Sequence, residues 1–116
     1  MINQNLFTDV LNSVENQLQN SEFGTGTTAP TTSDTDLETP IAGTNSAVDR
    51  IVKGSTYIQA ICKLATTEAN GNDITEAALK DGADELKSRV VFEAQTKTSD
   101  ISFDFIYGLT LSQTNL

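Results

Sequence analysis

The chain has 116 residues, of which 16 are acidic and 7 are basic, giving a formal net charge of −9. This length fits one domain, and the negative charge argues against binding to nucleic acid or to anionic membrane surfaces. Histidine is absent and there is one cysteine, which excludes the commonest general base, an intrachain disulfide and a cysteine metal cluster.

Targeting signals are also missing from the sequence. No stretch reaches the roughly 20 consecutive apolar residues that a membrane-spanning helix needs. The first residues, MINQN, lack the basic start and the apolar stretch of a signal peptide. We therefore expect the protein to be made and folded in a cytoplasm.

Residues 5–20 are expected to form one amphipathic helix. Apolar side chains recur there with helical spacing along a single stripe: Phe7, Val10, Leu11, Val14 and Leu18. Asn5 is suited to cap the start of this helix. The stripe must be covered either by the β core of the same chain or by a neighbouring subunit, and in the second case Phe7 and Leu11 are candidate interface residues.

Residues 21–46 are rich in threonine, glycine and aspartate and show no periodicity. Pro30 and Pro40 bias the residues before them to extended conformations. Two interpretations stay open: a long surface loop, or an extended arm that becomes ordered against a partner. For the arm, the apolar anchors and candidate interface residues are Leu37, Pro40 and Ile41.

Residues 47–116 are expected to form an antiparallel β domain. Alternating apolar residues and turn signals predict five strands, over residues 47–53, 56–66, 74–80, 86–92 and 101–111. In the second strand, the predicted inner face carries Ile58, Ala60, Cys62 and Leu64. The last strand is the clearest, and Phe103, Phe105 and Tyr107 should face the interior together.

The predicted fold class is therefore mainly β. One N-terminal amphipathic helix (residues 1–20) and an extended threonine-rich arm (residues 21–46) precede an antiparallel β-sandwich or open barrel. Cys62 lies near Ile61 and Leu64, which favours a buried structural thiol.

The sequence offers little for catalysis. The acidic cluster at residues 81–85 lacks the spacing of a calcium loop, and Gly24–Gly26 is too short for a phosphate-binding loop. With no activated nucleophile, we expect no enzyme activity, no catalytic residues, no metal site and no cofactor. Arg89 lies inside an apolar strand, where it either pairs with Glu76 across a hairpin or contacts a partner.

Several short segments follow one another in a recognisable order. They are the glycine-threonine block at residues 24–38, EANG at 68–71, ITEAAL at 74–79, LKSRVVF at 86–92 and KTS at 97–99. An alternating strand from residue 101 to 112 completes the series. This order and spacing resemble those of small structural proteins of tailed phages and archaeal tailed viruses. Ala78 and Lys80 depart from the family pattern, where a glycine and an aromatic are usual, and Tyr107 stands near the usual tryptophan.

The resemblance spans residues 23–112 and implies a non-enzymatic structural component of a virion. Such a protein docks onto other virion proteins and copies of itself, as a tail or fibre attachment protein or as a capsid-surface decoration. An alternative is a receptor- or glycan-binding module exposed on the virion. Sugar sites favour exposed aromatics, and this chain has 6% aromatic residues and no tryptophan, so we expect the assembly role.

Overall fold

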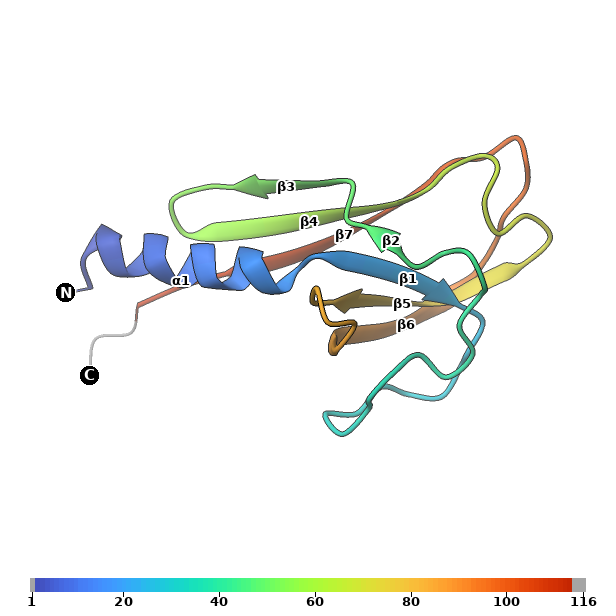
Figure 1. Cartoon of the computed structure of the whole chain (residues 1–116), viewed down its shortest axis with the longest axis horizontal. Coiled ribbons are helices and arrows are strands. Elements are labelled where there is room, and N and C mark those ends of the chain that lie inside the picture. The colour runs from blue at the N-terminus through green and yellow to red at the C-terminus, as the bar shows by residue number, and fades with distance from the viewer. Residues whose placement is uncertain (1, 114–116) are drawn as a thin grey trace.

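Two antiparallel β-sheets pack face to face in the computed structural model, which describes residues 2–113, and one helix lies at the end where the chain begins (Figure 1). The sheets are separate, so the fold is a β-sandwich and not an open barrel. This confirms the predicted mainly β class with an N-terminal helix. No helix among the described residues has the length and apolar character to cross a membrane.

The elements follow the chain as one helix and seven strands within the described residues. They are α1 (Gln4–Gln17), β1 (Asn20–Gly24), β2 (Ser46–Ala47), β3 (Arg50–Lys53), β4 (Tyr57–Leu64), β5 (Asp73–Lys80), β6 (Leu86–Thr96) and β7 (Phe103–Thr110). One sheet has the order β2-β1-β5-β6 and the other the order β3-β4-β7. The predicted strand over residues 47–53 is thus split between the two sheets.

Helix α1 covers the part of β4 that extends beyond the four-stranded sheet (Figure 1). Its N-cap is Asn3, whose side chain accepts the N–H of Asn5, and not Asn5 itself as expected. Leu11 is buried, while Phe7 and Val14 are half-buried. The apolar stripe therefore packs on the β core of its own chain, the first of the two alternatives.

The sequence pattern does not predict strand β1, because it places residues 20–24 partly in the helix and partly in the arm. This assignment is wrong: β1 pairs with β5 from Asn20↔Lys80 to Gly24↔Glu76 and lies in the middle of its sheet. Phe23 is fully buried in the core. A strand of five residues with one large apolar side chain has too little alternation to be recognised from sequence.

The core lies between β4 and β5. Its fully or largely buried members are Phe23, Ala60, Cys62, Leu64, Ile74, Ala77 and Leu79. The predicted inner face of β4 is confirmed, since Ile58 is buried together with these residues. Phe103, Phe105 and Tyr107 pack against this core as expected, although each is only half-buried.

Strands β6 and β7 lie along the same side of the sandwich. Phe92 of β6 stacks on Phe105 of β7, with ring centroids 5.2 Å apart, and also on Phe103, at 6.3 Å. Both strands are at the edges of their sheets. The half-buried aromatic rings therefore line an open side between two strand edges.

Candidate functional site

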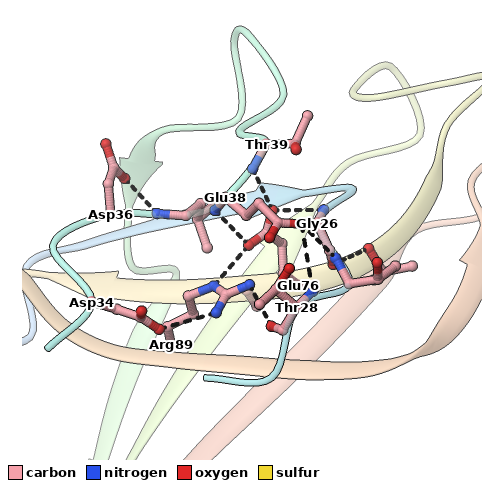
Figure 2. Close-up of polar contacts among 12 residues, drawn as sticks. Gly26, Thr28, Asp34, Asp36, Glu38, Thr39, Glu76 and Arg89 are labelled. Atoms are coloured by element: carbon pink, nitrogen blue, oxygen red, sulfur yellow. Dashed lines mark hydrogen bonds and ion pairs between the residues drawn. The ribbon is translucent and has the colours of Figure 1, made fainter. Parts of the chain in front are cut away.

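The outer face of the four-stranded sheet carries an unusual set of charged residues. Cross-strand pairing places Glu22, Glu76, Lys80 and Arg89 on this one face. Residues 25–45, here called the cover segment, fold over these charges and bond to them (Figure 2). In the single chain this segment therefore lies folded on the sandwich, and the two interpretations differ in whether it is already ordered before a partner binds.

Glu76 is the centre of the arrangement. Its carboxylate is fully buried and accepts four hydrogen bonds (Figure 2). The N–H groups of Gly26 and Thr39 donate to Oε2 at 2.7 and 2.8 Å. The N–H of Glu38 and Nε of Arg89 donate to Oε1, both at 2.9 Å. Three main-chain donors from the cover segment thus converge on one side chain of β5.

Two glycines permit this close approach. A Cβ atom added at Gly26 would stand 2.5 Å from Oε2 of Glu76 and 2.6 Å from Cβ of Glu38. A Cβ added at Gly24 would stand 2.5 Å from the same carboxylate oxygen and 2.5 Å from the carbonyl oxygen of Thr39. The two glycines of the glycine-threonine block are therefore explained by packing against a buried carboxylate.

Arg89 joins the hairpin of β5 and β6 to the cover segment. Besides the bond to Glu76, Nη1 contacts Oδ2 of Asp34 at 3.0 Å and Nη2 donates to the carbonyl oxygen of Thr28 at 2.9 Å. The predicted ion pair between Arg89 and Glu76 is confirmed. Because the Arg89 side chain is 4% exposed, it does not reach a partner at the surface.

The charges of this network stabilise one another. Burial alone would raise the pKa of Glu76, but the donors at Thr39, Arg89, Glu38 and Gly26 outweigh it and hold the pKa of this carboxyl below its usual value. Burial would likewise lower the pKa of Arg89, and its two carboxylate partners reverse that effect. Both groups stay ionised at neutral pH.

A second network surrounds Lys80, whose side chain is 3% exposed. Its Nζ lies 2.8 Å from Glu22, 2.9 Å from Asp36 and 3.6 Å from Asp84. Burial acts to lower the pKa of Lys80, but the bonds to Glu22 and Asp36 dominate and raise it. Lys80 thereby fixes the middle of the cover segment through Asp36.

The remaining candidate interface residues are also used within the monomer. Leu37 and Leu11 are 5% and 3% exposed, and Ile41 packs half-buried against the core. Pro40 is exposed, but its backbone bridges to Gly24. The side chains of Leu37, Leu11 and Arg89 are therefore not available for docking, and a docking surface has to lie elsewhere.

Apolar surface is exposed on both faces of β7 and on α1. Ile106 and Leu109 of β7 are 57% and 44% exposed, and Leu6 on the helix is 51% exposed. Between α1 and β7 lies a cavity of about 250 Å³, lined in part by Val14, Leu18 and Leu109. The sequence did contain one signal for this surface, because Ile106 is an isoleucine on the solvent side of an alternating strand.

The described residues show no group of three or more histidine, cysteine, aspartate or glutamate side chains placed to hold a metal ion. Cys62 is fully buried, as expected from its neighbours, and burial raises the pKa of its thiol to about 11. The charged clusters around Glu76 and Lys80 are satisfied by the chain itself. Their evident role is to hold the cover segment in place.

Comparisons with protein-family models, with curated proteins and with solved structures found no match for this chain. The resemblance to structural proteins of tailed viruses therefore stays a prediction.

Proposed function

We propose that this chain is a non-enzymatic structural component of a tailed-virus particle, which works by docking onto other virion proteins. The observation that carries the proposal is the nearly uncharged strand β7, a regular strand at the edge of a sheet that exposes Ile106 on its outer face and Leu109 on its inner face. Exposed strand edges and apolar patches are the usual means by which one protein adds to another.

The charge distribution supports a protein partner. Of the seven basic residues, Lys80, Arg89 and Lys97 are buried. Lys53 pairs with Glu15 and Lys87 with Asp81 and Glu85. The solvent-facing surface is therefore even more acidic than the composition suggests. Such a surface keeps the protein soluble before assembly and repels nucleic acid.

The internal use of charge also supports a scaffold role. Glu76 and Arg89 bond the cover segment to the sandwich, and the eight-residue ladder with β4 holds the docking strand β7, so the surface that meets a partner is ordered before docking. A rigid surface loses little conformational entropy on assembly. This property suits a tail or fibre attachment protein and a capsid-surface decoration equally.

Particles produced by the genome that encodes this chain provide the test. Mass spectrometry of gradient-purified particles should detect the chain in stoichiometric amount, and electron microscopy with an antibody raised against the purified protein should label the particles. Repeating both measurements after removal of the tails assigns the protein to tail or capsid. Absence of the protein from purified particles would overturn the proposal.

A further inference from the structure

Four strands form the edges of the two sheets, and three of them carry features that discourage pairing with another chain. Strand β2 has two residues, and β3 has four residues bounded by Arg50 and Lys53. Strand β6 has two register shifts and exposes Lys87 and Glu93. These are the short, charged and bulged edges by which β-proteins avoid unwanted association.

Strand β7 has none of these protections. It pairs with β4 without a register shift over all eight residues, from Phe103↔Leu64 to Thr110↔Tyr57. Its one charged residue, Asp104, lies near one end. A long, regular and nearly uncharged edge favours the addition of another strand.

The hydrogen-bonding groups of this edge are identified by the register. Leu111 N–H donates to the carbonyl oxygen of Thr56, and in an antiparallel ladder alternate residues bond to the same neighbour. The odd-numbered residues of β7 therefore bond to β4. The outward N–H and C=O groups belong to Asp104, Ile106, Gly108 and Thr110.

The charge pattern indicates where a second copy of the chain can approach. A protein with a net charge of −9 is repelled by another acidic copy over most of its surface. Residues 105–113 carry no charge, so this repulsion is weakest at β7. If two β7 strands pair antiparallel about Tyr107, the two Asp104 side chains lie about 20 Å apart, beyond the screening length of about 8 Å at physiological salt.

We propose that two copies of the chain pair through antiparallel β7 strands about a two-fold axis at Tyr107. The two three-stranded sheets then form one continuous six-stranded sheet, with the self-complementary geometry of a two-fold dimer. Ile106 faces Gly108 of the second copy, which leaves room for its side chain. Asp104 faces Thr110 of the second copy, so no like charges meet.

The same pairing accounts for the half-buried aromatic side. Phe92, Phe103 and Phe105 line the open side between β6 and β7. A second copy at the β7 edge would cover part of these rings. The edge and the rings then form one interface that combines main-chain hydrogen bonds with apolar contact.

Sedimentation equilibrium of the full chain over a range of concentrations tests this pairing. The wild-type protein should show twice the monomer mass of 12.4 kDa. Ile106→Lys places like charges close to the two-fold axis, and Gly108→Pro removes an outward N–H while leaving the ladder to β4 intact. Each should weaken dimerisation about tenfold or more.

Val52→Lys is the matched control. Val52 is an exposed apolar residue, on the same outer face of the same sheet, but on strand β3. The Val52→Lys substitution changes the net charge by the same amount as Ile106→Lys and should leave the dimer intact. A wild-type monomer at every concentration, or a dimer that survives Gly108→Pro, would overturn the pairing.

Hydrogen exchange supplies a readout that does not depend on the variants. The amides of Ile106 and Gly108 should exchange more slowly as the wild-type concentration rises, and concentration-independent exchange would reject the pairing. The inference extends the docking role proposed above by naming a partner. The dimer and the virion role are tested separately. A protein that is monomeric but present in particles rejects only the dimer, and a protein that is dimeric but absent from particles rejects only the virion role.

Discussion

Glu76 and Arg89 form a buried ion pair diagonally across the hairpin of β5 and β6, with 2.9 Å between Oε1 and Nε. The same carboxylate accepts main-chain N–H groups from Gly26, Glu38 and Thr39. One side chain therefore joins a hairpin to a segment that lies far away in the sequence. The stability of the cover segment should depend on its charge.

Replacing Glu76 by glutamine should destabilise the protein by about 3–5 kcal/mol, because it leaves the buried Arg89 without its nearest counter-charge. Chemical denaturation at neutral pH measures this change in the free energy of unfolding. Glu93→Gln is the control, since Glu93 is exposed on the neighbouring strand and should change stability by less than about 0.5 kcal/mol. Equal effects at the two positions would contradict the role of Glu76.

The contribution of Glu76 should depend on pH in a defined direction. Its pKa is lower in the folded protein than the ordinary value of 4.5. Its stabilisation is therefore fully present above pH 4.5 and is lost as the pH falls through the lower, folded-state value. The stability difference between wild type and Glu76→Gln should be constant near neutral pH and shrink in acid. A difference that grows with acidification would contradict this sign.

Gly26→Ala should destabilise the protein by about 1–3 kcal/mol, as overpacking of a close contact does. The added Cβ meets Glu76 and Glu38 at distances that require the cover segment to move. Gly82→Ala is the matched control, because its Cβ would meet only Gln19 at 3.9 Å. Thermal unfolding of both variants tests this comparison. A Gly26→Ala protein as stable as the wild type would show that the cover segment can move without any loss of stability.

Amide hydrogen exchange should show that the cover segment is ordered in the isolated chain. The N–H groups of Gly26, Glu38 and Thr39 should exchange slowly in the wild type and fast in Glu76→Gln, because each donates to the carboxylate. Fast exchange in the wild type would instead favour an arm that becomes ordered only against a partner.

Cys62 should resist alkylation in the native protein. It is fully buried, and burial raises the pKa of its thiol to about 11. At neutral pH the alkylating reagent therefore cannot reach the sulfur atom, and little of the thiol is in the reactive thiolate form. Mass spectrometry after treatment with iodoacetamide should show modification only once denaturant unfolds the chain. Native modification at the unfolded rate would place Cys62 at the surface.

Much of the sandwich could be predicted from local patterns. The two-residue alternation of Phe103, Phe105 and Tyr107 correctly indicates the inner face of β7. The pairing of Glu76 with Arg89 was also predictable, because opposite charges lie in two adjacent strands of one hairpin. Both features depend on residues that are close in sequence or on one periodicity.

The missed features depend on contacts between distant residues. Strand β1 can be recognised only from its partners in the fold. Ser21 is polar but is buried beside Phe23, and Glu22 is charged but is held by an ion pair with Lys80. The cover segment has no periodicity because it is held by main-chain N–H groups and a few scattered side chains, such as Asp34 and Asp36, and not by an alternating apolar face. The one available signal was the glutamate inside the apolar strand β5, since a buried carboxylate requires donors from somewhere in the fold.

The position of β1 in the middle of its sheet has a consequence for how the chain folds. β1 pairs with β5 across more than fifty residues, and β4 pairs with β7 across roughly forty to fifty. Proteins dominated by such distant pairings fold slowly, because long loops must close before the contacts stabilise them. Among the described strands, the β5–β6 hairpin is the one local pair in which both strands are long, and it already carries both Glu76 and Arg89. During synthesis the N-terminal residues must therefore wait for this hairpin, and the three-stranded sheet is complete only when the last strand, β7, has left the ribosome.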